Sequence, residues 1–257
     1  MLDRLSNILT VVGLTLMELR ARGPIEGVWA DSSQFKAKAD RIAHDLLIRG
    51  LGEMTPDIVT VSEEDFSHAS ERPSEYWLID PIDGTASYAG GFAGFVTQAA
   101  LMKGNAPILA AVHAPALGLT YLAEKNQGVR LNGQLFGIEA SDPYRAVLID
   151  NYPEPRDTAL AAYQELSMTG YVESGSIALK ICRVADGTAD LFFKDVPLKD
   201  WDVAPAELIL SEAGGVMTGI DGSPFPYVGD WVKPGVIAAR SEPLLERFQA
   251  WHTARFS

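Results

Sequence analysis

The feature that most restricts the possible folds of this chain is the order of its helix-like and strand-like patterns. Apolar residues recur at helical spacing in the first twenty residues and again over residues 39–51, where Gly50 is the expected end. Short apolar runs separated by turn residues follow, at residues 58–61, 76–80, 95–102 and 108–114. This half therefore predicts two helices on an antiparallel sheet.

From about Tyr144 the pattern changes to strand-like and helix-like segments in alternation, ending with a helical "PLLERFQAWH". Such alternation is typical of an α/β layer. We expect a fold of the α+β or α/β class with two parts, residues 1–143 and 144–257. The length of 257 residues is ample for a substantial core.

Charge and cysteine content exclude several classes of protein. The formal net charge is −13, which disfavours binding to a nucleic acid polymer, and we find no basic cluster to offset it. Cys182 is the one cysteine, which excludes a disulfide scaffold or a zinc finger and favours a reducing, cytoplasmic setting. The longest N-terminal apolar stretch is too short to span a bilayer, so no membrane partner is expected.

The stretch "YWLIDPIDGT" places two acids where a strand-like run ends. Pro81 has a fixed φ, so it can hold Asp80 and Asp83 on one side of a tight turn with the Ile82 carbonyl between them. Three converging oxygens suit a hard cation such as Mg²⁺. Gly84 would let a ligand approach the backbone and Thr85 would be a helix N-cap beside a phosphate site. The alternative is a plain hairpin turn, because Asp-Gly is a common turn signal.

Two further acidic stretches lie elsewhere in the chain. Glu63 and Glu64 follow the strand-like "IVTVS", and Asp202 stands behind Trp201 just before a helical pattern. Taken singly, the pair could be a solvated acidic loop and Asp202 a helix N-cap.

Together the three stretches resemble the inositol monophosphatase superfamily of Mg²⁺-dependent, lithium-sensitive phosphatases. The resemblance runs from about Ala37 to Gly215 and is strongest in "WLIDPIDGT" and "WDVAPAELILSEAGG". It implies a layered α-β-α-β-α sandwich of the kind shared with fructose-1,6-bisphosphatases. It also implies hydrolysis of a small soluble phosphomonoester by metal-activated water, with two or three Mg²⁺ ions as cofactors.

The resemblance implies roles for individual positions. The metal ligands would be Glu63, Asp80, the Ile82 carbonyl, Asp83 and Asp202. Asp40 and Thr85 would orient the attacking water, with Glu64 as the next candidate for that role. The substrate would be held by Gly84, Thr85, Gly175, Ser176, Ile177 and Asp195. Most ligands fall in residues 1–143, whereas Asp202 and the substrate-facing loop fall in residues 144–257.

The sequence also departs from the family pattern, because Ala37 stands where relatives usually carry a threonine. The departure leaves undecided whether the protein has a third metal site. Inositol monophosphate is the first substrate expected from the resemblance. The alternatives are a 3′(2′),5′-bisphosphate nucleotide such as 3′-phosphoadenosine-5′-phosphate, then histidinol phosphate or fructose 1,6-bisphosphate. A binding protein without catalysis is a further alternative, and a homodimer is an expectation drawn from relatives.

Overall fold

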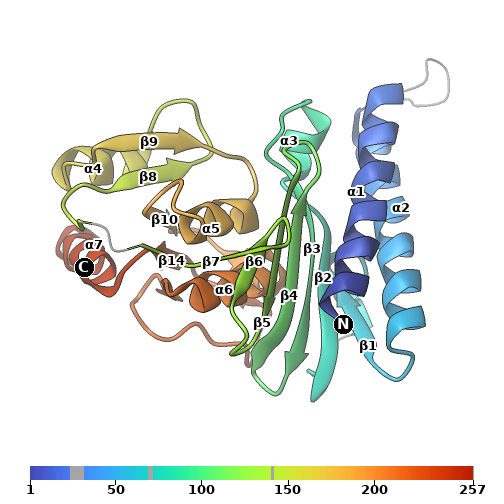
Figure 1. The fold of residues 1–257 in the computed structure, drawn as a ribbon. Helices are drawn as coiled ribbons and strands as arrows, with labels where there is room; N and C mark the ends of the chain where they lie inside the picture. The colour runs from blue at the N-terminus through green and yellow to red at the C-terminus, as the bar shows by residue number, and fades with distance from the viewer. Residues whose placement is uncertain (24–31, 69–71, 140–141, 257) are drawn as a thin grey trace.

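The computed structural model describes residues 1–23, 32–68, 72–139 and 142–256. Its elements are stacked in the order α-β-α-β-α, which confirms the expected layered sandwich (Figure 1). Helices α1 (Leu2–Arg22) and α2 (Ser32–Met54) cover the outer face of a large sheet. Helices α5 (Ile177–Ala185) and α6 (Asp200–Ala213) lie between the two sheets, and α4 (Asp157–Glu165) and α7 (Glu242–Phe256) close the far side.

The first sheet has seven strands in sequential order. All neighbours are antiparallel except the first two, which are parallel and joined through the 3₁₀ helix η1 (Glu63–His68). The strands are β1 (Val59–Ser62), β2 (Glu75–Asp83), β3 (Val96–Lys103), β4 (Ala106–Ala114), β5 (Leu119–Glu124), β6 (Val129–Leu131) and β7 (Gln134–Phe136). The antiparallel sheet predicted from the sequence is thus correct from β2 onward, and the β1–β2 pairing is the exception.

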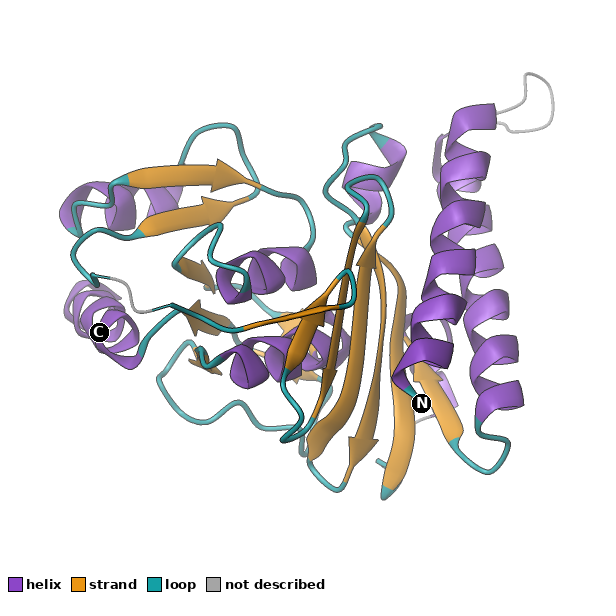
Figure 2. Ribbon diagram, viewed as in Figure 1, coloured by secondary structure: helices purple, strands orange, loops and turns teal. Residues whose placement is uncertain are grey.

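The second sheet has the strand order β12-β14-β10-β8-β9 and mixes parallel and antiparallel neighbours. Figure 2 shows it separated from the first sheet by a layer of helices. Its strands are β8 (Val147–Asp150), β9 (Gly170–Glu173), β10 (Leu191–Lys194), β12 (Val216–Gly219) and β14 (Val236–Ala239). A separate two-stranded ribbon pairs β11 (Leu198–Lys199) with β13 (Val232–Lys233) just before α6.

Both faces of β2 are buried, which explains the continuous apolar run in this strand. Trp77 and Ile79 pack toward α1 and α2, whereas Tyr76 and Leu78 belong to the core that contains α5 and α6. Successive side chains of a strand point to opposite faces, so a strand covered on both sides has no polar positions to alternate with.

The end expected for the second helix at Gly50 is wrong, because α2 continues to Met54. A Cβ on Gly50 would lie 2.9 Å from carbon atoms of Ile8, so this glycine allows α1 and α2 to approach closely. Gly50 therefore marks a close contact between two helices and not the end of α2. Across the described ranges, no helix combines the length and apolarity needed to cross a bilayer.

Candidate active site

A β-bulge in β2 brings the two acids of the "DPID" stretch to the same face of the sheet. Asp80 pairs with Gln98 and Asp83 with Val96, so three steps along β2 oppose two along β3. Without the extra residue, Asp80 and Asp83 would point to opposite faces. The extra residue turns Ile82 toward α1 and α2 and leaves both acids facing α5 and α6. The acids are therefore gathered by a bulge within a strand, which replaces the predicted tight turn.

Asp83 lies against the N-terminus of α5. Its Oδ2 accepts hydrogen bonds from the Ser176 hydroxyl at 2.5 Å and from the backbone N–H of Ala178 at 2.8 Å, and its Oδ1 accepts from the N–H of Ile177 at 3.4 Å. Ser176 is also the N-cap of α5, because its Oγ accepts from the N–H of Leu179 at 2.9 Å. Burial raises the pKa of Asp83, and these donors oppose that rise. The structure thus joins the predicted substrate loop to a predicted metal ligand.

Asp80 is buried near three other carboxylates. Burial raises its pKa well above the ordinary value, and the charges of Glu63, Asp83 and Asp202 raise it further. Glu63, the first residue after β1, shares a side-chain hydrogen bond with Asp80, and burial raises its pKa too. Two carboxyls that share a hydrogen bond hold a proton between them. This corner of the protein therefore concentrates negative charge that needs protons or cations to offset it.

Asp202 is the third residue of α6, not its N-cap as considered from the sequence. The N-cap is Lys199, whose N–H donates to Oδ2 of Asp202 at 2.8 Å in a capping box. Burial and the nearby Asp83 raise the pKa of Asp202 to about 7. The Lys199 ammonium lies 3.9 Å from a Glu63 carboxylate oxygen, and its charge opposes the rise in the pKa of that acid.

Two of the positions expected to orient a water, Thr85 and Asp40, lie on different helices. Thr85 is the first residue of the short helix α3 (Thr85–Ala89); the N-cap is Gly84, with φ 85°, so the predicted Thr85 cap is wrong. The Thr85 hydroxyl donates to the Ile82 carbonyl at 3.0 Å. Asp40 is buried on α2, close enough to Tyr88 for its charge to raise the Tyr88 pKa. Glu64 is exposed, so the structure favours Asp40 over Glu64 for a buried role.

Three glycines from different segments meet beside the acids. A Cβ on Gly84 would lie 2.8 Å from the Gly94 carbonyl, and a Cβ on Gly94 would lie 2.5 Å from the N of Gly175. A Cβ on Gly175 would overlap the Ser87 hydroxyl. Only glycine permits this approach of three backbones, which leaves polar main-chain groups at the surface of the site. The family resemblance implies that Gly84 and Gly175 contact the substrate, and the structure brings these two glycines close together through Gly94.

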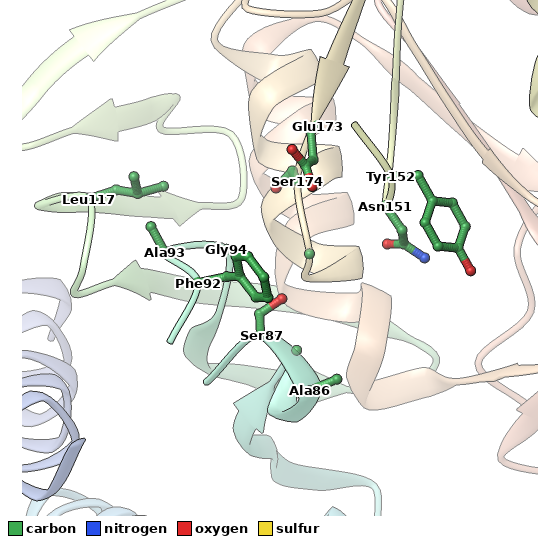
Figure 3. Close-up of a pocket in the computed structure, with 12 residues that line it drawn as sticks. Ala86, Ser87, Phe92, Ala93, Gly94, Leu117, Asn151, Tyr152, Glu173 and Ser174 are labelled. Carbon is green, nitrogen blue, oxygen red and sulfur yellow. The ribbon is translucent and has the colours of Figure 1, made fainter. Parts of the chain in front are cut away.

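A cavity of about 510 Å³ opens over these glycines (Figure 3). Ser87 and Phe92 lie along one side, and Asn151, Tyr152 and Glu173 come from the second half of the chain. The cavity is large enough for a small phosphorylated molecule.

Asp195 lies apart from this cavity. It is exposed after β10 and lines a second cavity of about 240 Å³, together with Lys180, Lys194 and Arg156. Asn151 and Tyr152 line both cavities, so the two adjoin. The role predicted for Asp195 stays a prediction.

Lys180 is a residue that the sequence reasoning did not single out. It is buried in α5, its ammonium donates to the Asn151 side-chain oxygen, and it lies 4.8 Å from the Phe192 ring centroid. Burial lowers its pKa to about 8, and the charges of Asp150 and Asp83 oppose that shift. A lysine between apolar residues in "SIALKIC" was the available signal, because a buried lysine needs a specific reason.

The donor set fits a hard divalent cation in its chemistry, since carboxylates and a carbonyl oxygen are preferred by Mg²⁺. Within the described part of the chain, no three His, Cys, Asp or Glu side chains are already arranged to hold one ion. Asp83 and Asp202 instead accept hydrogen bonds from backbone N–H groups. The side chain of Ala37, where the family pattern departs, lies outside the described residues.

Comparison with known proteins places this arrangement in a family. A model of the inositol monophosphatase family matches residues 10–254. The 3′(2′),5′-bisphosphate nucleotidase CysQ of Escherichia coli K12 is 31% identical over 238 residues, covering 88% of this chain and 94% of CysQ. The putative Nus factor SuhB of Neisseria meningitidis serogroup B is 29% identical over 239 residues, covering 89% of each chain.

The fold agrees with these matches. The solved structure of an inositol monophosphatase from Thermotoga maritima superposes with a TM-score of 0.81 at 25% identity, covering 99% of this chain and 96% of that one. The expected resemblance is confirmed. The chain belongs to the inositol monophosphatase family and, like that family, is a phosphoric monoester hydrolase.

Proposed function

We propose that the protein hydrolyses a small phosphomonoester with Mg²⁺ held by Glu63, Asp80, the Ile82 carbonyl, Asp83 and Asp202. One observation carries the proposal: buried carboxylates that raise one another's pKa adjoin a cavity lined by half-buried glycine backbone. Bound cations would offset the repulsion between the carboxylates. Backbone N–H groups of the glycine segments would donate hydrogen bonds to the phosphate. Bound Mg²⁺ supplies Lewis acidity and a coordinated water of lowered pKa.

Thr85 and Asp40 are proposed to orient the water. A hydroxyl group can donate one hydrogen bond, and the Thr85 hydroxyl donates its hydrogen bond to the Ile82 carbonyl. Toward a water molecule Thr85 therefore acts as an acceptor. The Ile82 carbonyl keeps a second lone pair for a cation. Removal of the water's proton would fall to Asp40, because Thr85 has no basic group.

The choice of substrate depends on Lys180. The family resemblance alone favours inositol monophosphate, but a buried ammonium beside the cavity favours a substrate with a second anionic group. CysQ carries the name of a 3′(2′),5′-bisphosphate nucleotidase. We therefore propose a bisphosphate nucleotide as the preferred substrate and inositol monophosphate as the second candidate.

A phosphate-release screen tests both parts of this proposal. The substrates are adenosine 3′,5′-bisphosphate (3′-phosphoadenosine-5′-phosphate), inositol 1-phosphate, histidinol phosphate and fructose 1,6-bisphosphate, each with Mg²⁺ and with excess chelator. We expect turnover that chelator abolishes and the highest kcat/KM for the nucleotide. Full activity in chelator would exclude the metal-dependent mechanism.

Lys180→Met separates the substrates. Burial already disfavours the Lys180 charge, so methionine should leave the protein folded. We expect KM for the bisphosphate nucleotide to rise about ten-fold or more, as for loss of a charged hydrogen bond. KM for inositol 1-phosphate should change less than about two-fold. Lys125→Met, at an exposed lysine, is the control.

A further inference from the structure

Exposed apolar side chains gather at the rim of the main cavity. Phe92 is 66% exposed, Leu117 45% and Tyr152 44%, and all three line the cavity although they come from separate segments. Isolated exposed apolar residues are ordinary, but a group of them around one cavity indicates contact with a ligand. The cavity thus combines a polar glycine floor with an apolar rim.

The Phe92 backbone and ring are held in a defined position. Its N–H donates to the Ser87 carbonyl at 2.9 Å, and its own carbonyl accepts from Arg20 of α1 at 2.8 Å. A Cβ on Gly90 would lie 3.0 Å from two atoms of the ring, so the ring rests on this glycine. Figure 3 shows Phe92 beside Ser87 and Gly94, with Asn151 and Tyr152 across the cavity. An aromatic ring kept in water by these contacts is preorganised for a ligand.

We infer that Phe92 is a specificity-determining residue that stacks on a planar aromatic group of the substrate, a nucleobase. The phosphate to be cleaved would lie on the glycine floor, and the base would extend to the rim. A flat face gains contact area and dispersion against another flat ring, and stacking of a base on an aromatic side chain is tolerant of base identity. A polyhydroxylated cyclitol would gain little there, because its hydroxyl groups would lose water.

This inference rests on the proposed phosphatase function, so its test includes a readout that needs no turnover. Titration calorimetry in Mg²⁺ compares adenosine 5′-monophosphate with ribose 5-phosphate, which carries a hydroxyl group in place of the base. The proteins are wild type, Phe92→Ala, Phe92→Trp and Val228→Ala, the last at an exposed residue outside the cavity. Kinetics with adenosine 3′,5′-bisphosphate and inositol 1-phosphate accompany the binding data.

We expect Phe92→Ala to weaken adenosine 5′-monophosphate about ten-fold and ribose 5-phosphate less than two-fold. KM for the bisphosphate nucleotide should rise by the same factor with kcat unchanged, because stacking is equal in ground and transition states. Phe92→Trp should retain the wild-type affinity for adenosine 5′-monophosphate and the wild-type KM for the bisphosphate nucleotide. Val228→Ala should match wild type in both measurements.

Equal weakening of both ligands by Phe92→Ala, or of neither, would overturn the stacking role even in an active phosphatase. A wild type that binds both ligands equally would overturn it as well. A wild type that binds the nucleotide through its base but releases no phosphate from any substrate would instead refute the proposed function and leave the stacking role supported.

Discussion

The Ser176 hydroxyl donates to Oδ2 of Asp83 over 2.5 Å, and this hydrogen bond links the two halves of the chain at the candidate active site. Asp83 ends the bulged strand of the first sheet, and Ser176 caps the helix that lies between the sheets. A carboxylate at a helix N-terminus is stabilised by the free N–H groups and by the helix dipole. The position of Asp83 is therefore set by α5 as much as by its own strand.

Ser176→Ala should weaken both the helix and the site. Loss of the cap and of a donor to a buried carboxylate should lower stability by about 1–2 kcal/mol. We expect half-maximal activity to require several-fold more Mg²⁺, because Asp83 loses a contact that orients it. Measurement is by thermal unfolding and Mg²⁺ titration of activity. Ser211→Ala, at an exposed serine of α6, should change neither.

Asp202→Asn should raise the melting temperature of the metal-free protein while nearly abolishing activity. Burial and, after it, the charge of Asp83 raise the pKa of Asp202, so the folded state disfavours the charged carboxylate, and neutralising it should add about 1 kcal/mol, or about 2–4 °C. The amide oxygen can still accept from the Lys199 N–H. The gain in stability on adding Mg²⁺ should shrink, because binding to the native state is its source.

Asp221→Asn is the matched control, because hydrogen bonds from Ser223 lower the pKa of this nearly exposed acid. It should not raise the melting temperature, and its response to Mg²⁺ should equal that of wild type. If Asp202→Asn were less stable than wild type in chelator and gained as much from Mg²⁺, Asp202 would be only a capping residue.

The metal-free protein should lose stability as pH rises from about 4 to 7. Asp202 has a folded-state pKa of about 7 and Asp200 of about 6, both above the ordinary value near 3.8. Between those values the folded state binds more protons than the unfolded state, so unfolding releases protons and stability falls with rising pH. Denaturant unfolding across this range with chelator measures the slope. Asp202→Asn should make it shallower, and an unchanged slope would contradict the assignment.

Arg72→Met should be strongly destabilising, because it leaves Asp200 buried without its main partner. Arg72 lies 2.5 Å from Asp200 Oδ2, donates to the carbonyls of Gly229 and Asp230, and stacks 3.8 Å from the Trp231 ring centroid. Removing one partner of a buried pair costs about 3–5 kcal/mol. Thermal unfolding should show a fall of several degrees.

An exposed ion pair provides the control for Arg72. Arg41 pairs with Asp45 on α2, with both side chains more than half exposed. Arg41→Met should cost less than about 0.5 kcal/mol. If the two variants lost the same stability, burial of Asp200 would not explain the role of Arg72.

Gly175→Ala should abolish activity and destabilise the fold, whereas Gly52→Ala should stabilise it. A Cβ on Gly175 would overlap the Ser87 hydroxyl and lie 2.5 Å from the Gly94 carbonyl, so the cavity floor would have to open. Gly52 lies in α2 with open space around it, and alanine there should add about 0.5–1 kcal/mol. An active Gly175→Ala enzyme would contradict the proposed phosphate floor.

Local patterns were enough to predict most elements of the fold. The spacing of Leu5, Leu9, Val12 and Leu16 indicates α1, and the alternation after Tyr144 indicates the second layer of strands and helices. Such patterns follow from which side chains must be buried in each element, and they act within one element at a time. Through the family resemblance, the "DPIDGT" and "WD" stretches pointed to the acids now proposed to bind metal, because residue type and order are properties of the chain.

Relations between distant segments were decided by the tertiary structure. The bulge that turns Asp80 and Asp83 to one face appears only in the pairing of β2 with β3. The hydrogen bond between Ser176 of the α5 cap and Asp83 joins two residues that lie 93 positions apart in the sequence. Lys180 and Phe92 became candidate substrate contacts only when the structure showed that each lines a cavity, because whole-chain packing decides which side chains are buried and which are exposed. A sequence lists the chemical groups in order, but only folding decides which of them share a space from which water is excluded.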